Sequence, residues 1–331
     1  MPGTRHEDRV ALASQSPAAV TRLAASWRRS MIHHGLDPAQ TTTPLRLSDH
    51  ELNQRRTRMR SLLSAAAPQL DHLFQLVCPT GCNVLLTDAD GIVLEHRVGA
   101  GDAQAFRVFG LWQGTSWAEK HEGTNGIGTC LFEGRPVTIH REDHFYARNT
   151  RISCIDAPIW GPDGRIIGAL DVSSARHDNS PQWNALIAAQ VAQTARMIEA
   201  ELFRAAFPKA RIIVAPQMDR GENPLLLAVD RDDLMIGANR AARRAFGLEK
   251  EGRLRPLPAA DLLAQDDADR DLGQAGRRIV VSALMREKGN VSAAARVLGI
   301  SRATLYRRIR HLGLDKDLGR AIVSDLKQTR R

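Results

Sequence analysis

The C-terminal part of the chain restricts its folding most, because apolar residues recur there at helical spacing between helix-breaking residues. The segment GQAGRRIVVSALMREKGNVSAAARVLGISRATLYRRIRHLGL predicts three helices in succession. Gly289 ends the first helix and Asn290 caps the second, and Gly299 and Ser301 repeat this arrangement before the third. The apolar stripe of the first helix consists of Ile279, Val280, Ala283 and Leu284. Two helices joined by a tight turn are therefore expected in this segment.

The basic residues of the chain are concentrated in the same segment. Residues 275–331 hold 14 Lys and Arg against 4 Asp and Glu, whereas residues 61–274 hold 22 against 28. A basic segment beside a weakly acidic middle indicates that the segment binds a polyanion. On charge alone, a merely solvated tail is equally compatible with this distribution.

The third predicted helix has an apolar face and a basic face. Leu305, Ile309 and Leu312 recur at helical spacing and define a buried stripe. Arg307 and Arg310 then lie on the outward face, which suits an element placed in the major groove of DNA. Arginine there can bind guanine edges or phosphates.

The segment GNVSAAARVLGISRATLYRRIRHLGL resembles the Fis-type helix-turn-helix at the C-terminus of many bacterial transcription regulators. The resemblance implies that the chain binds a double-stranded DNA operator. It also implies that the helix from about Gln274 to Glu287 lies in a homodimer contact. The implied DNA contacts are Ser301, Arg302, Thr304, Tyr306, Arg307 and Arg308. Two alternatives stay open: Tyr306 packs against its own helix, and Arg310 is a solvated charge.

The middle of the chain predicts mixed strands and helices. NVLLTDADGIVLEHRV indicates two strands around an Asp-Ala-Asp-Gly turn, and SCIDAPIWGPDGRIIGALDVSS indicates a longer hairpin. Between them we expect a short helix that Thr124 or Asn125 caps and that ends at Glu133. A strand from Pro136 to His140 should follow.

A long helix is expected from Pro181 to about Phe203. Its apolar stripe includes Ile187, Val191, Ile198 and Leu202. The stripe has two interpretations. It pairs with the same stripe of a partner chain and transmits ligand state toward the DNA-binding segment, or it only covers the neighbouring sheet.

The stretch from about Leu70 to Phe203 resembles a GAF domain of the acetoin-catabolism regulator type. The resemblance rests on SWRRSMIHHGLDP, VLLTDADGIVL, GTNGIGTCL, HREDHFYARN and APIWGPDGRIIGALDVSS. It implies an α+β fold, an antiparallel sheet with flanking helices, followed by an all-α helix-turn-helix domain. Residues 1–69 would form a helical N-terminal extension, residues 70–205 the GAF sensor and residues 274–331 the DNA-binding domain.

The segment PLLLAVDRDDLMIGANRAARRAFGL resembles the opening of a PAS domain. Residues 206–260 would form a truncated PAS-like unit, and residues 261–273 a linker within the stretch from Pro256 to Asp271. Full-length members of this regulator family place an AAA+ ATPase between the sensor and the helix-turn-helix. The sequence contains neither a GxxxxGK[ST] loop nor a GAFTGA-like loop, so we expect no ATPase activity.

The cysteines and histidines offer weak candidates for chemistry. Cys78 and Cys82 are spaced C-x₃-C, and His140 and His144 are spaced H-x₃-H, but neither pair has the pattern of a zinc site. Cys130 and Cys154 fall in apolar elements, where a buried thiol packs as a small hydrophobe. A GAF-fold thiol reductase is the enzymatic alternative, and it would need an accessible thiolate of low pKa. We expect no catalytic residue, no metal and no cofactor.

The pocket of a GAF domain usually lies between the sheet and the inserted helix and loop, here Trp112 to Asn149. The candidate effector-binding residues are Trp112, Trp117, Asn125, His140, Phe145 and Tyr146. For each of them, core packing or helix capping is the alternative.

These features predict a cytoplasmic, sequence-specific transcription regulator that senses a small-molecule effector and acts as a homodimer. RNA polymerase is a further candidate partner. No apolar run long enough for a membrane span and no secretory signal occur, so no membrane partner is expected. An architectural DNA-binding dimer with a ligand-free GAF domain is the alternative.

Overall fold

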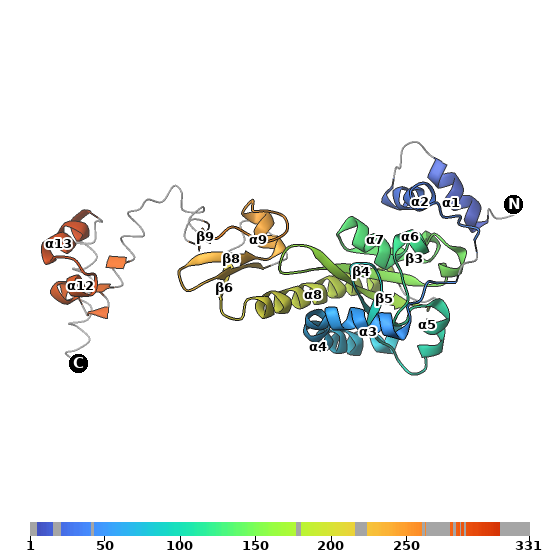
Figure 1. Cartoon of the computed structure of the whole chain (residues 1–331), viewed down its shortest axis with the longest axis horizontal. Helices are drawn as coiled ribbons and strands as arrows, with labels where there is room; N and C mark the ends of the chain where they lie inside the picture. Colours follow the sequence, from blue (N-terminus) through green and yellow to red (C-terminus); the bar gives the residue numbers. More distant parts are fainter. Residues whose placement is uncertain are drawn as a thin grey trace. The chain divides into compact units, whose positions relative to one another are not determined.

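The computed structural model describes two compact units, Met1–Ala259 and Ala260–Arg331, which are treated separately below. The described residues are 5–15, 21–40, 43–176, 180–215, 224–259 and 289–311, together with 262, 279, 280, 283, 284, 286 and 287. The first unit combines helices with two antiparallel sheets, and the described part of the second is helical, in agreement with the expected α+β class (Figure 1). No helix within these ranges is long and apolar enough to cross a membrane.

Five antiparallel strands form the large sheet, in the order β2-β1-β5-β4-β3. They are β1 (Cys82–Thr87), β2 (Val93–Arg97), β3 (Val137–His140), β4 (Ser153–Trp160) and β5 (Ile166–Ser174). Both expected hairpins are confirmed, β1 with β2 and β4 with β5. The interior strand β1, which lies between β2 and β5, is buried along its whole length, because helices cover both faces of the sheet.

Two long helices cover the first face of the large sheet, α4 (Arg60–Val77) and α8 (Pro181–Ala206). Ser180 caps α8 by accepting a hydrogen bond from the Trp183 N–H (3.2 Å), and Pro181 occupies its first turn. The boundary expected between residues 69 and 70 falls inside α4. Leu62 and Leu70 of that helix pack in one core with the sheet, so the helix is continuous across this position.

The apolar stripe of α8 lies in this core. Ile187, Val191, Ile198 and Leu202 are at most 5% exposed, and they pack with α4 and with strands β4 and β5. The stripe therefore covers the large sheet. Its predicted pairing with the same stripe of a partner chain is wrong, because these side chains are already buried within their own chain.

Three short helices cover the second face: α5 (Ala103–Phe109), α6 (Glu119–Glu122) and α7 (Gly126–Glu133). The expected cap at Asn125 and the expected end at Glu133 are both confirmed. Helix α7 lies so close to the sheet that a Cβ atom on Gly126 would be 2.0 Å from Oδ2 of Asp156. Glycine at the first position of α7 allows this approach.

The N-terminal hairpin, α1 (His6–Gln15) and α2 (Arg22–Ile32), packs on the loop that follows β3. Val10 and Trp27 of the hairpin form a small apolar cluster with Phe145 and Tyr146 of the loop. Figure 1 shows the hairpin in blue beside α6 and α7. Helix α3 (Asp49–Arg58) then leads into α4, and its N-terminus has a reciprocal capping box between Ser48 and Glu51.

A second, small sheet follows α8, with strand order β6-β7-β8-β9. Its elements are β6 (Arg211–Ala215), β7 (Leu225–Val229), β8 (Leu234–Ala238), α9 (Arg240–Ala245) and β9 (Leu257–Pro258). The predicted order of strand, turn, strand and helix is present in β7, β8 and α9. The stretch from Pro256 is not all linker, because Leu257 and Pro258 pair with β8 and Ala259 is buried. Apart from Leu262, the linker expected at residues 261–273 lies outside the described residues.

Candidate functional site

The second unit presents two short helices, α12 (Val291–Val297) and α13 (Arg302–His311). The Asn290 side chain caps α12 by accepting two backbone N–H groups at 3.1 Å. Ser301 Oγ caps α13 by accepting the Thr304 N–H, also at 3.1 Å. Gly299 between the helices has a φ of +62°, a conformation that favours glycine. The predicted helix, turn and helix are therefore present.

Apolar side chains join these two helices to the preceding segment. Leu305 and Ile309 of α13 are buried together with Ala294, Ala295, Val280, Ala283 and Leu284. Ile279 departs from the predicted stripe, because it is 57% exposed while its neighbour Val280 is fully buried. Leu312 and most of the predicted helix from Gln274 to Glu287 lie outside the described residues.

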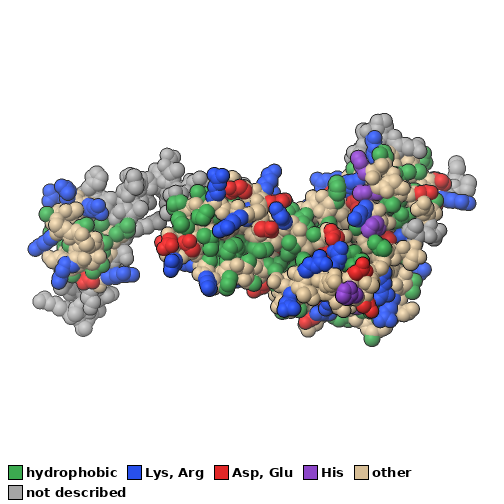
Figure 2. All heavy atoms as spheres, viewed as in Figure 1, with side chains coloured by type: hydrophobic (Ala, Val, Ile, Leu, Met, Phe, Trp, Pro, Cys, Tyr) green, Lys and Arg blue, Asp and Glu red, His purple; other side chains and the backbone are tan. Residues whose placement is uncertain are grey.

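The outward face of α13 carries most of the predicted DNA contacts. The exposed ones are Ser301, Arg302, Tyr306, Arg307 and Arg308. Thr304 is half-buried, and its hydroxyl lies 2.8 Å from Ser301 Oγ at the helix cap. The Arg302 guanidinium lies 5.6 Å from the centroid of the Tyr306 ring. Figure 2 shows Lys and Arg side chains around these helices, which gives a basic surface on a helix held by an apolar core.

The residues predicted to bind an effector are dispersed over the first unit. Trp117 is 1% exposed in the core under the second face, and its Nε1–H donates to the carbonyl of Gly110 (2.9 Å). Asn125 uses both ends of its amide locally, since Oδ1 accepts the Gly128 N–H and Nδ2 donates to the Gly123 carbonyl, each at 2.8 Å. Core packing and capping account for these two residues.

The other four candidates also lie apart. Trp112 is half-buried and contacts the ring of His96 in a tilted arrangement, with ring centroids 4.0 Å apart. Phe145 and Tyr146 are buried under the N-terminal hairpin, whereas His140 is exposed at the end of β3. The six predicted residues therefore do not line one common pocket in the described structure.

A row of buried polar side chains crosses the second face of the large sheet instead. Asn83, Asp156, Asp171 and Ser173 are each at most 1% exposed, and Asp156 lies opposite Asp171 in the pairing of β4 with β5. Within the described part of the chain, Asn83 Oδ1, both oxygens of Asp156 and Asp171 Oδ1 have no hydrogen-bond partner. The sequence signal for this row was a polar residue at alternate positions of otherwise apolar strands.

Burial favours the protonated form of the two carboxyl groups in this row. Burial, and then the neighbouring Asp171, raise the pKa of Asp156 well above its usual value. Burial also raises the pKa of Asp171 to about 7, although the Ser173 hydroxyl opposes the rise by donating a hydrogen bond at 2.7 Å. His144 is close to this row but brings no positive charge, because burial lowers its pKa to about 4. A proton on the pair therefore replaces a counter-ion.

Three buried thiols lie in or beside the large sheet, and their surroundings oppose ionisation. Burial raises the pKa of the Cys130 and Cys154 thiols well above the usual value, and it raises that of Cys82 as well. Cys154 Sγ accepts a hydrogen bond from the Ser173 hydroxyl (3.2 Å). Thiol chemistry requires the opposite, an accessible thiolate of lowered pKa. Among the residues that the structure describes, no group of three or more His, Cys, Asp and Glu could hold a metal ion.

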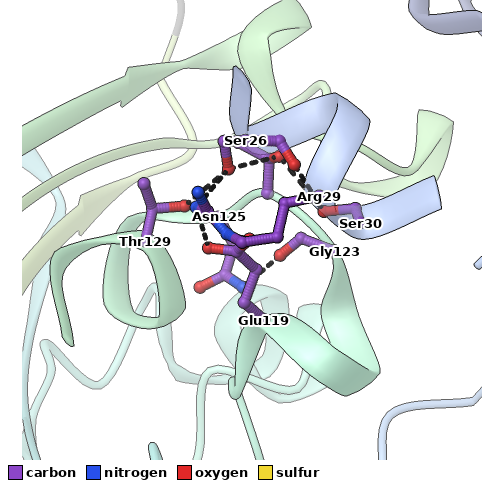
Figure 3. Close-up of polar contacts among 8 residues, drawn as sticks. Ser26, Arg29, Ser30, Glu119, Gly123, Asn125 and Thr129 are labelled. Atoms are coloured by element: carbon purple, nitrogen blue, oxygen red, sulfur yellow. Dashed lines mark hydrogen bonds and ion pairs between the residues drawn. The ribbon is translucent and has the colours of Figure 1, made fainter. Parts of the chain in front are cut away.

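A polar cluster joins the N-terminal hairpin to α6 and α7 (Figure 3). The Arg29 guanidinium binds both oxygens of Glu119, at 2.5 and 2.8 Å, and the two side chains are only 14% and 4% exposed. Beside this ion pair, Ser26 Oγ lies 2.8 Å from Thr124 Oγ1 and 3.4 Å from Thr129 Oγ1. A nearly buried, bidentate ion pair of this kind fixes the orientation of the two elements that it joins.

Two family models match the chain. The model described as "MimR, N-terminal domain" matches residues 5–195, which include the hairpin, the large sheet and most of α8. The model described as "Bacterial regulatory protein, Fis family" matches residues 274–312.

The curated proteins that are similar to this chain include transcription regulators. The acetoin catabolism regulatory protein of Cupriavidus necator is 32% identical over 243 residues, which are 72% of this chain and 36% of that protein. The propane 2-monooxygenase operon transcriptional activator MimR of Mycolicibacterium smegmatis is 34% identical over 173 residues, 51% of this chain and 28% of that protein. The chain thus spans about a third of the length of these relatives.

Among solved structures, the crystal structure of the E. coli DhaR(N)-DhaL complex has a similar fold. The TM-score is 0.50 at 17% sequence identity, over 74% of this chain and 85% of the compared chain. At this identity the similarity concerns the fold alone.

Proposed function

Because the chain belongs to the family of the MimR N-terminal domain, we propose that it is a DNA-binding transcription regulator that senses a small molecule. In this proposal α13 reads a DNA operator, and the first unit binds the effector. The regulator acts as a homodimer, and it alters transcription without hydrolysing ATP. Its relatives regulate acetoin catabolism and the propane 2-monooxygenase operon, which supports an effector of low molecular weight.

The main support for this proposal is that α13 has one apolar, buried face and one basic, exposed face. Leu305 and Ile309 hold the helix on an apolar core, and the opposite face exposes Arg302, Arg307 and Arg308. A helix-turn-helix protein places such a helix in the major groove, with its N-terminal turn at the base edges. The match to the Fis-family model covers the same residues.

Two further observations support the regulator over an enzyme. The thiols whose pKa values are raised by burial are poor nucleophiles, so a reductase built on them is disfavoured. The exposed Ile279 precedes the helix-turn-helix in the segment where the homodimer contact is proposed, and an exposed apolar side chain suits a partner chain there.

The proposal is tested by selecting DNA fragments from the source genome with the purified full chain and sequencing those retained. We expect fragments that share one inverted motif with half-sites about one helical turn apart. The Arg302→Ala and Arg307→Ala variants should lose this enrichment. Arg58→Ala is the matched control, because Arg58 is exposed on α3, outside the second unit, and its loss changes the net charge equally. Retention of the same fragments by all three variants would contradict the proposal.

A further inference from the structure

A cleft of about 210 Å³ lies between the N-terminal hairpin and the edge of the large sheet. Helix α2 forms one wall through Arg22, Leu23 and Ser26. Helix α7, strand β3 and the residues next to them form the other. The cleft is smaller than the roughly 300–1,000 Å³ of pockets for drug-sized ligands, so it limits an occupant to a few heavy atoms.

Buried hydroxyl groups line the inner part of this cleft. Ser26, Thr124 and Thr129 are at most 3% exposed, and all three belong to its lining. Their oxygens form one hydrogen-bonded group, and the Arg29 guanidinium donates to Ser26 Oγ at 3.2 Å (Figure 3). Each hydroxyl can both donate and accept, so the group can bind an oxygen atom of either kind by rotating its hydrogens.

The rest of the lining consists of apolar and charged side chains and of the exposed Thr138. Leu23, Pro136, Val137 and Ile139 supply apolar wall. Glu133 and Arg135 form an ion pair with each other, and the Asp143 carboxylate accepts the backbone N–H of His140 at 3.2 Å. Arg22 belongs to the lining as well, but it is exposed. A charged occupant would lose hydration without gaining a buried counter-ion, whereas a neutral one would not.

We propose that this cleft is the effector site of the protein and that it binds a small neutral oxygenated molecule, such as a short-chain alcohol, diol or ketone. The oxygen of the ligand forms hydrogen bonds with the cluster of three hydroxyls of Ser26, Thr124 and Thr129. The carbon chain of the ligand contacts Leu23 and Val137. This inference rests on the proposed function, since it names the site and the class of effector for the sensor.

The position of the cleft couples the ligand to the hairpin. One wall belongs to α2, and the other belongs to α7 and β3, so an occupant contacts both. Binding therefore favours the docked hairpin over any arrangement in which α2 leaves the sheet. The family model includes both walls, because it starts at residue 5, before the hairpin.

The test measures binding of butanone, butanediol and lactate to the full chain by isothermal titration calorimetry. We expect the neutral compounds to bind more tightly than lactate, which has similar size but carries a negative charge. Thr129→Val keeps the shape of the side chain and removes the hydroxyl, so it should weaken binding about fivefold, the effect of one neutral hydrogen bond. Thr129→Ser keeps the hydroxyl and should retain most of the affinity.

Ser30→Ala is the matched control. Ser30 lies one turn after Ser26 on α2, is fully buried and contacts Thr124 at 3.4 Å, but it does not line the cleft. Ser26→Ala should weaken binding and Ser30→Ala should not, with thermal unfolding confirming that both variants fold. The site is refuted if no neutral compound binds, if lactate binds best, or if Thr129→Val and Ser30→Ala leave the same affinity. Such a result would leave operator selection by the wild-type chain unchanged, so it is distinguishable from failure of the proposed function.

Discussion

The paired carboxyl groups of Asp156 and Asp171 make stability depend on pH in an uncommon direction. Both pKa values are raised in the folded chain, so the folded chain binds protons more tightly than the unfolded chain does. The contribution of the two protonated carboxyl groups to the free energy of unfolding is therefore complete below the ordinary aspartate pKa, and it is lost as pH rises toward about 7. Burial raises the pKa of Glu199 to about 7 as well, which adds a loss in the same window. The first unit should therefore be more stable at pH 5 than at pH 8.

Asp156→Asn tests this account, because the amide can donate to Asp171 without titrating. We expect the variant to unfold at higher denaturant concentration than the wild type at pH 8, and the difference to shrink at pH 5. Each unit of pKa difference between folded and unfolded chain corresponds to about 1.4 kcal/mol, so a gain of one to a few kcal/mol is expected. Asp232→Asn, on an exposed turn, should leave the free energy of unfolding unchanged at both pH values. A wild-type stability that rises steadily from pH 5 to pH 8 would contradict it.

Individual residues show where prediction from the sequence ended. The cap at Asn125 could be predicted, because an asparagine before an apolar run is a local signal. The roles of Trp117, Phe145 and Tyr146 could not be predicted, because an aromatic side chain contributes to a core or to a pocket depending on its neighbours in space. The hydroxyl group of Ser26, Thr124 and Thr129 was also missed, because about a hundred residues of sequence separate its two parts.

The N-terminal hairpin is held in part by a nearly buried ion pair, Arg29 with Glu119, whereas its ion pair between Arg9 and Glu142 is exposed. Arg29→Ala leaves the Glu119 carboxylate buried without its partner, which commonly costs about 3–5 kcal/mol. We expect the hairpin to become protected less well against hydrogen exchange, with a smaller change in the large sheet. Arg204→Ala is the control, because its ion pair with Glu201 is half-exposed and contributes at most about 1 kcal/mol. Equal exchange in both variants would mean that the other contacts of the hairpin, apolar and polar, hold it in place without Arg29.

Helix α8 shows how one pattern can serve two structures. A stripe at helical spacing fits a partner chain as well as a sheet, and only the structure shows that Ile198 is fully buried against α4 and the large sheet. Ile198→Ala should therefore destabilise the first unit by about 2–5 kcal/mol. Met197→Ala, on the exposed side of the same helix, should stay within about 0.5 kcal/mol. The free energy of unfolding is measured by chemical denaturation. Similar decreases in both variants would contradict the burial of Ile198 in the core.

For the whole chain, the distribution of charge along the sequence predicted the domain organisation most reliably. The basic segment and the periodic pattern lie at the same end of the chain, so the helix-turn-helix and its separation from the sheets could be predicted. The boundary between the N-terminal extension and the sensor could not be predicted, because the continuous helix α4 crosses it and its apolar residues on both sides pack in one core. The small sheet also extends further than expected, because β9 pairs with β8 across a loop that carries no strand signal.

The concentration of basic residues in the second unit predicts strong dependence of DNA binding on salt. Residues 275–331 carry 14 Lys and Arg against 4 Asp and Glu, and each phosphate that they neutralise should contribute about −0.9 to the slope of log K against log salt. Fluorescence anisotropy at several salt concentrations gives this slope. Deleting residues 275–331 should abolish binding, and a slope near zero in the full chain would exclude a phosphate-bound helix-turn-helix.

If α13 reads a DNA sequence, the chain binds its operator more tightly than an unrelated duplex, and the ratio of the two binding constants measures this preference. The full chain is titrated by anisotropy with its selected operator and with a scrambled duplex of the same length and composition, at the same salt concentration. We expect the operator to bind at least about a thousandfold more tightly than the scrambled duplex. A ratio near one would show that the basic helix binds phosphate alone, and the protein would then be no sequence-specific regulator.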